Sequence, residues 1–252
     1  MGFLDVLGGG NTLYYPGCLT KAVLPDIEEN YKQIMRKLGI DFIMLGEKEL
    51  CCGSPPRSQG YDDDVKSLAL KNRDVFKAHG VKKVLTSCPT CHSVLSTYKD
   101  AIDWDIAVEH VVIPIEKALG RVKFPKYSGL KVTYHDPCHM GRYSGIYEQP
   151  RRILASLGCE IVEMKYSRER ALCCGGGGGV RANYPEMAKA VAEERMEYAK
   201  KTGADILVTS CPMCYICLKE AAKGIEVYEL SQLLVGMKKE NLPKNSKLAK
   251  YC

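Results

Sequence analysis

The sequence lacks long apolar runs, a leader segment and clustered positive charge. No stretch approaches 18 uncharged apolar residues, so we expect no transmembrane helix. The first ten residues, MGFLDVLGGG, lack a basic start and a long apolar centre, so we expect no secretory signal peptide. The 36 Lys and Arg residues are scattered and the net charge is only +6, which indicates no nucleic-acid partner.

Cysteine, in contrast, is abundant, with 13 residues in a chain of 252. Without a leader we expect a cytoplasmic protein, and in that reducing compartment disulfide frameworks are rare. A chain of this length with 46% hydrophobic residues can also bury a core without disulfide staples. The cysteines therefore indicate metal binding or redox chemistry.

Three short motifs occur twice in the same order. The pairs are YYPGC and YHDPC at 14–18 and 134–138, KELCCG and RALCCG at 48–53 and 170–175, and LTSCPTC and VTSCPMC at 85–91 and 208–214. Corresponding cysteines lie 120 to 123 positions apart, and such near-constant spacing indicates an internal duplication. We expect two domains, an N-terminal repeat at 1–125 and a C-terminal repeat at 126–252.

Strand and helix patterns alternate in each half. In the first half they predict strands at 12–15, 41–45 and 81–86, with helices over 27–38 and 65–76 between them. The second half repeats the order, with a helix expected from Pro185 to about residue 201. Such alternation is typical of parallel sheets covered by helices. We predict an α/β fold of two pseudo-repeated, Rossmann-like halves with parallel sheets.

Each half contributes five cysteines, all expected just after strands. They are Cys18, Cys51, Cys52, Cys88 and Cys91 in the first half, and Cys138, Cys173, Cys174, Cys211 and Cys214 in the second. Ligands of open parallel sheets bind beyond the carboxyl ends of the strands, so the five can converge there. Three further cysteines, Cys159, Cys217 and Cys252, fall outside this pattern. We expect Cys159 and Cys217 in the core; for Cys217, three residues after Cys214, a role as an additional ligand is the alternative.

Five thiols are one too many for a tetrahedral zinc ion or for an ordinary [4Fe–4S] cube. Either one cysteine of each half is idle, or the metal centre is larger and less regular. The glycine run in LCCGGGGGV (172–180) suits close approach of backbone to a bulky group.

The repeated pattern, with CCG followed by CPxC, resembles the cysteine-rich CCG domain family. That family includes the B and D subunits of heterodisulfide reductase and iron–sulfur subunits of glycolate, lactate and glycerol-3-phosphate oxidoreductases. The resemblance covers about residues 14–230, and YHDPCHMGRYSGIYEQPR (134–151) is most similar to the D type.

The resemblance implies that each five-cysteine motif holds a noncubane [4Fe–4S] cluster, with a substrate disulfide such as CoM-S-S-CoB split between the two. The first motif, CCGSPPRSQG, lacks the glycine run of the second, so zinc is an alternative occupant of the first half.

Six side chains beside the cysteines are candidates for handling substrate. His92, His135 and His139 adjoin the cysteine motifs and can donate protons to leaving thiolates; hydrogen bonding near a cluster is the alternative. Arg57, Arg142 and Arg181 can orient the anionic ends of a substrate; exposed arginines that aid solubility are the alternative.

The chain has no G-x-G-x-x-G motif and no ferredoxin-type cysteine run, so we expect it to receive electrons from partners. Those partners are a ferredoxin-like [4Fe–4S] subunit and, beyond it, a flavin, haem or hydrogenase subunit, in a complex that can be membrane-associated. Three functions stay open: a disulfide-reducing subunit, an electron-transfer subunit of a flavin-dependent lactate- or glycolate-type oxidoreductase, and a zinc-bound assembly module.

Overall fold

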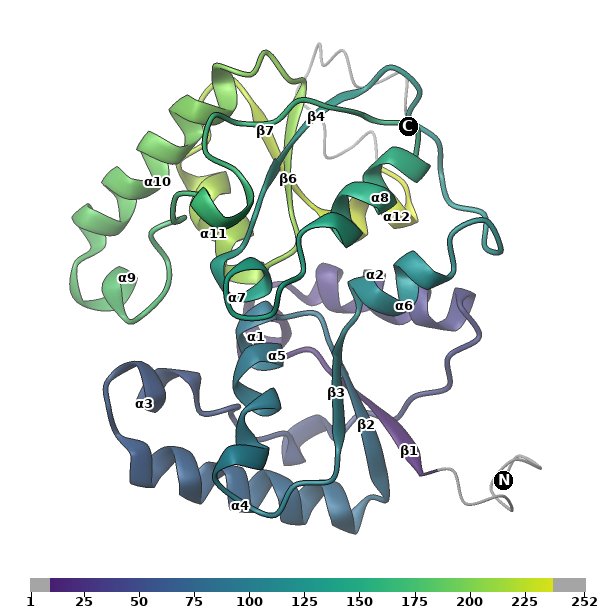
Figure 1. The fold of residues 1–252 in the computed structure, drawn as a ribbon, viewed down its shortest axis with the longest axis vertical. Coiled ribbons are helices and arrows are strands. Elements are labelled where there is room, and N and C mark those ends of the chain that lie inside the picture. The colour runs from purple at the N-terminus through teal and green to yellow at the C-terminus, as the bar shows by residue number, and fades with distance from the viewer. Residues whose placement is uncertain (1–9, 238–252) are drawn as a thin grey trace.

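Two separate parallel sheets organise the chain, as Figure 1 shows for the computed structural model, which describes residues 10–237. The first sheet has the strand order β1-β2-β3. Its strands are β1 (Asn11–Tyr15), β2 (Val81–Thr86) and β3 (Ala107–His110). The second sheet has the order β5-β4-β6-β7. Its strands are β4 (Lys131–His135), β5 (Glu160–Ile161), β6 (Ile206–Thr209) and β7 (Glu226–Glu229).

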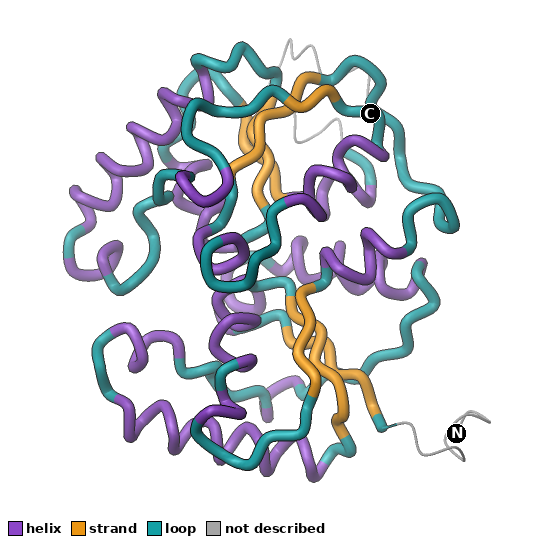
Figure 2. The backbone as a smooth tube through the Cα atoms, viewed as in Figure 1, coloured by secondary structure: helices purple, strands orange, loops and turns teal. Residues whose placement is uncertain are grey.

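Helices connect the strands and cover the sheets (Figure 2). Those of the first half are α1 (Cys18–Val23), α2 (Pro25–Lys37), α3 (Ser54–Ser58), α4 (Asp62–Ala78), α5 (Pro89–Ser96) and α6 (Val112–Lys117). Those of the second half are α7 (Cys138–Gly141), α8 (Glu148–Ser156), α9 (Val180–Asn183), α10 (Pro185–Lys200), α11 (Pro212–Glu220) and α12 (Leu230–Val235). The predicted α/β class with parallel sheets is confirmed.

The two sheets repeat one topology. β1, β2 and β3 correspond in order to β4, β6 and β7. The strand expected at 41–45 is reduced to one parallel bridge between Ile43 and Leu13, in the place that β5 occupies beside β4. At this edge only two backbone hydrogen bonds form, between Ile43 and residues of β1. The expected domain boundary between residues 125 and 126 stays a prediction.

The halves share their largest core. α2 packs on α12, and α8 packs on α6, so each contact joins a helix of one half to a helix of the other. The apolar stripe of α2, including Ile34 and Met35, is buried there together with Ile153 of α8 and Leu233 of α12. This crossed packing holds the carboxyl ends of the two sheets against each other.

Glu229, at the end of β7, is a carboxyl group buried within this core. Its side chain accepts hydrogen bonds from the Tyr31 hydroxyl of α2 (2.7 Å) and from the backbone N–H of Ser231 (2.7 Å). Burial raises the pKa of Glu229 from 4.5 to about 7. The native chain therefore holds a proton on Glu229 at pH values where the unfolded chain has released it.

The free energy of unfolding should consequently decrease as the pH rises between about 4.5 and 7, by up to about 3 kcal/mol from this group. The stabilisation is fully present below the lower pKa and is lost as the pH passes the higher one. Urea unfolding of Glu229→Gln should lack this slope, whereas Glu226→Gln, at the half-buried start of the same strand, should retain it. Equal slopes in both variants would rule out Glu229 as the source.

Candidate metal centres

The five cysteines of the first half converge at the carboxyl end of its sheet. Cys18 begins α1 directly after β1, and Cys88 precedes α5, with Cys91 in the first turn of that helix. Cys51 and Cys52 lie in the loop before α3. The five thiols contact one another in the sequence Cys18, Cys51, Cys52, Cys91 and Cys88.

The second half repeats most of this arrangement. Cys138 begins α7, and Cys211 precedes α11, with Cys214 in its first turn. Cys174 contacts both Cys173 and Cys214, and Cys214 contacts Cys211. Cys138 lies near Cys173 and Cys214 without a direct hydrogen bond to either. The structure thus brings together all ten cysteines that the sequence singled out, five in each half.

The paired cysteines do not directly follow strands, contrary to expectation. Cys51 and Cys52 come after the isolated bridge at Ile43 and a short 3-10 turn, Gly46–Lys48. Cys173 and Cys174 come after β5 and the equivalent turn Arg168–Arg170. Longer connections let each pair reach across to the thiols that follow the neighbouring strands.

A glycine after each cysteine pair is required by the backbone. Gly53 and Gly175 have φ of 81° and 82°, in the left-handed region. Their N–H groups donate to Cys51 Sγ (3.4 Å) and Cys173 Sγ (3.3 Å). A Cβ on Gly175 would lie 2.2 Å from the carbonyl oxygen of Ala188 in α10. The start of the glycine run therefore serves helix packing as well as the thiols.

Gly175→Ala should lower the free energy of unfolding by about 2 kcal/mol or more, because it combines left-handed strain with a backbone clash. Gly177→Ala is the matched control: within the described residues no atom lies within 4 Å of an added Cβ. Its effect should stay within about 0.5 kcal/mol. Denaturant unfolding under anaerobic conditions measures both, and equal losses would contradict this account of Gly175.

Some thiols in each group are placed to ionise, while the pKa values of neighbouring thiols such as Cys18, Cys52 and Cys174 are raised. Hydrogen bonds from Cys18, and then from Cys52, lower the pKa of Cys51. Hydrogen bonding by Cys174 lowers the pKa of Cys173, and contacts with Cys174, Cys211 and His135 lower that of Cys214. Thiolates are the form that binds metal, so the pattern suits metal centres rather than inert core cysteines.

The two thiol groups face each other across the junction of the halves. α5 packs on α7, and α1 packs on α11, and each of these helices carries or adjoins cysteines. His92 of α5 is within hydrogen-bond distance of Ser144 Oγ (3.0 Å), and Gln59 Nε2 donates to the Gly178 carbonyl (3.3 Å). The glycine loop of one half thus touches the end of α3 in the other.

The three candidate histidines lie at or beside this junction. His139 is half-buried, with its Nδ1 3.4 Å from Cys138 Sγ and its ring stacked on Tyr143. Burial lowers the pKa of His139 and of His92. His135 is fully buried and contacts Cys214, which places it behind the thiols rather than at an open face.

The three candidate arginines are already engaged with protein groups. Arg142 donates to the backbone carbonyls of Glu169 (3.2 Å) and Ala171 (2.9 Å) just before Cys173. Arg181 forms a two-bond ion pair with Glu220 and approaches Cys217 Sγ at 3.5 Å. Arg57 donates to the Thr97 hydroxyl.

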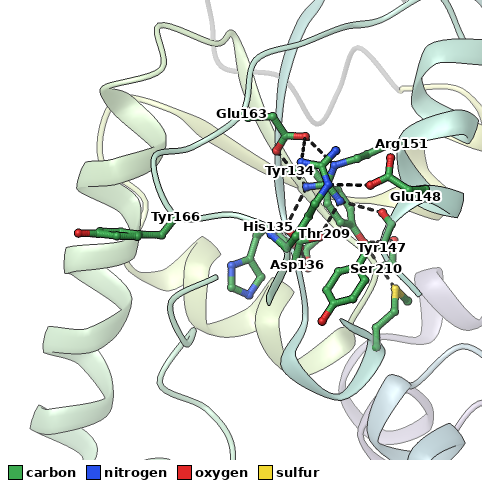
Figure 3. A network of polar contacts seen from close by, with 12 residues as sticks. Tyr134, His135, Asp136, Tyr147, Glu148, Arg151, Glu163, Tyr166, Thr209 and Ser210 are labelled. Atoms are coloured by element: carbon green, nitrogen blue, oxygen red, sulfur yellow. Dashed lines mark hydrogen bonds and ion pairs between the residues drawn. The ribbon is translucent and has the colours of Figure 1, made fainter. Parts of the chain in front are cut away.

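Sequence reasoning missed two features of the second half. One is a buried ionic network in which Arg151 of α8 pairs with Asp136 (2.6 Å) and Glu163 (2.6 Å), as Figure 3 shows. The other is Arg195 of α10, which is fully buried and donates through Nε to His135 Nδ1 (3.1 Å). A polar residue on the inner face of a predicted helix was the signal that could have pointed to Arg195.

The donor set fits a polynuclear iron–sulfur group better than zinc. Each half gathers five thiols, several backbone N–H donors to sulfur and at least one helix N-terminus, whereas a closed zinc site needs four ligands. Cys217 is buried, as expected of a core residue, and it also adds a sixth sulfur in contact with Cys174, as expected of an additional ligand. Cys159 is buried as expected, and Cys252 lies outside the described residues.

Fold and site together define a duplicated α/β protein with a polythiol centre in each half. The chain belongs to the CCG family, because the cysteine-rich domain of that family matches residues 12–96 and again residues 132–219.

Relatives of known name point to redox complexes. The chain is 37% identical, over 81% of its length, to the D subunit of dihydromethanophenazine:CoB–CoM heterodisulfide reductase from Methanosarcina acetivorans. It is 30% identical over 88% of its length to EtfAB:quinone oxidoreductase of Syntrophomonas wolfei. It covers 52% of the first protein and 32% of the second, so it spans about half or less of these relatives. The relatives and the domain support iron–sulfur clusters in a redox enzyme subunit.

The fold has a solved counterpart. A hypothetical protein from Helicobacter pylori matches with a TM-score of 0.70 at 10% identity, over 92% of this chain and 50% of the other. No helix within residues 10–237 is both long and apolar enough to cross a bilayer.

Proposed function

We propose that the chain is the disulfide-reducing iron–sulfur subunit of a larger complex, with one noncubane [4Fe–4S] cluster in each half. One observation carries the proposal: two complete five-thiol groups face each other across the junction formed by α5 with α7 and α1 with α11. A disulfide needs two electrons and releases two thiolates, so a pair of facing centres matches its chemistry.

The ten cysteines would hold the two clusters, which supply one-electron transfer and iron sites for thiolate when bound. Zinc stays the alternative for the first half. His139 and His92 lie at the junction, where a side chain can deliver protons to departing sulfur. Arg57, Arg142 and Arg181 would orient anionic substrate groups.

His135 has a different place in this proposal. Because it is buried behind Cys214 and accepts a hydrogen bond from Arg195, it is better suited to supporting a ligand than to proton delivery. We therefore assign proton transfer to His139 and His92 first.

The substrate we propose is CoM-S-S-CoB or a related mixed disulfide, in keeping with the name of the Methanosarcina relative. Electrons would come from a ferredoxin-like [4Fe–4S] subunit, supplied in turn by a flavin, haem or hydrogenase subunit. The balance is R–S–S–R′ with two electrons and two protons, giving RSH and R′SH.

The test is an anaerobic assay of the iron-loaded chain with reduced benzyl viologen and CoM-S-S-CoB. The proposal expects viologen oxidation with two thiols appearing for every two electrons consumed. Cystine serves as a control disulfide without sulfonate or phosphate groups. If the chain is reduced by viologen but releases no thiol from any disulfide, it is not the cleaving subunit.

A second candidate is electron transfer without disulfide cleavage, as in a subunit serving a flavin partner. The similarity to EtfAB:quinone oxidoreductase favours it, since that name describes passage of electrons to quinone. Rapid electron exchange with a purified flavoprotein, together with absent thiol release, would select this function.

A further inference from the structure

Arg195 is a buried cation next to the thiols of the second half. Its side chain is 0% exposed, and its Nη1 donates to the Tyr166 carbonyl (2.8 Å) while its Nε donates to His135 Nδ1 (3.1 Å). Its Nη2 has no hydrogen-bond partner within the part of the chain that the structure describes. An arginine buried with an unpaired N–H is costly to the fold, which indicates a role beyond stability.

His135 connects this cation to the ligands. With Nδ1 accepting from Arg195, hydrogen-bond logic places the ring proton on Nε2. The ligand atoms of His135, Cys174 and Cys214 lie within 4.8 Å of one another, and His135 contacts Cys214. Arg195 therefore holds the His135 ring so that its Nε2–H can donate to the thiols.

The acidic groups near Arg195 do not cancel its charge locally. Asp136 and Glu163 are the carboxylates that face it, and both are already bound by Arg151. Arg195 itself has no ion pair among the described residues.

The first half has uncharged residues in the corresponding places. Tyr15 ends β1 as His135 ends β4, and its hydroxyl donates to the Leu50 carbonyl (2.6 Å). Asn72 occupies in α4 the place of Arg195 in α10, and its amide donates to the Cys51 carbonyl (2.9 Å). The two halves thus share the thiols but differ in charge at the residues that pack next to them, which are neutral in the first half and include a cation in the second.

We propose that the buried Arg195–His135 pair makes the two centres unequal, so that the first electron added to the chain resides in the second half. This inference rests on the proposed iron–sulfur function. Reduction adds one negative charge, and a buried cation in a medium of low dielectric constant favours the state with that extra charge. Arg195 acts through His135 and is a positioning residue.

Two variants that each keep one metal centre test whether the two centres differ in midpoint potential, and neither changes Arg195. Cys91→Ser should leave only the second-half centre, and Cys214→Ser only the first-half centre. Potentiometric titration, followed by visible absorption and EPR, should give a higher midpoint for Cys91→Ser. The expected difference is at least tenfold in the reduction equilibrium, about 59 mV for one electron. An equal or reversed order overturns the inference.

Variants of Arg195 then test whether its positive charge causes the difference in midpoint potential. Arg195→Gln should lower the reduction equilibrium constant of the second-half centre at least tenfold, which is a fall of about 59 mV in its midpoint potential. The midpoint of the first-half centre should not change. Arg195→Lys should retain most of the raised midpoint of the second-half centre. Arg36→Gln, at a 62% exposed side chain, is the control for loss of one positive charge. Unchanged midpoints in Arg195→Gln overturn the inference, and if that variant fails to fold, the single-centre comparison decides alone.

The two proposals can fail separately. If the purified chain contains no iron, the proposed function fails and the inference falls with it. If both centres contain iron but have the same midpoint, only the inference fails.

Discussion

Serine at position 214 should remove the second-half centre while the first-half centre stays. Cys214 contacts Cys174, Cys211 and His135, more groups than its counterpart Cys91 contacts, and it is buried. We expect iron per chain to fall from about eight to about four. Disulfide cleavage should fall at least about 100-fold, since loss of an outer partner alone can cost that much at a metal site.

Cys159→Ser is the matched control, because Cys159 is buried but lies outside both thiol groups. It should retain the full iron content and the rate of thiol release. Retention of about eight irons in Cys214→Ser, measured together with acid-labile sulfide, would show that Cys214 is not a ligand.

Methionine in place of Arg151 should lower the free energy of unfolding by about 3–5 kcal/mol. Arg151 is 5% exposed and binds both oxygens of Asp136, which is 3% exposed, as well as Glu163. Methionine fills a similar volume but leaves the Asp136 carboxylate buried without its cation. Because Asp136 lies between His135 and Cys138, the loss should also loosen the second thiol group.

Arg152→Met provides the comparison at the next residue. Arg152 is 51% exposed and pairs with Glu116, so its loss should cost no more than about 1 kcal/mol. Anaerobic urea unfolding of both variants measures the difference. Comparable losses would mean that the Arg151 network contributes little beyond an ordinary surface pair.

The sequence predicted the parts of the structure that depend on local pattern. The strand at 81–86 and the helix from Pro185 appear where periodicity and proline placed them, and the duplicated motifs became equivalent positions in two sheets. The convergence of the cysteines that come directly after strands followed from the rule that parallel strands end at one edge, whereas the two adjacent pairs reach that edge through longer connections. The prediction of a full strand at 41–45 was wrong. This segment lies at the edge of the sheet, where two backbone hydrogen bonds to β1 hold it in place.

Features that join the halves could not be predicted from one sequence. Periodicity shows which face of α2 is apolar but not that this face packs on α12 of the other repeat. Arg195 lies within one half, and its place on the inner face of the predicted helix was a signal, but a charged residue in a helix is normally solvated. The glycine run was interpreted as backbone for a bulky group, whereas Gly175 is also required by contact with α10.

The measurement that tests the central claim most directly is iron, acid-labile sulfide and zinc per chain after anaerobic purification. Two facing iron–sulfur centres predict about eight irons and no zinc. About four irons with one zinc would leave a single cluster and favour electron transfer over disulfide cleavage. Zinc alone, with metal exchange during expression excluded by iron-supplemented growth, would contradict the redox function altogether.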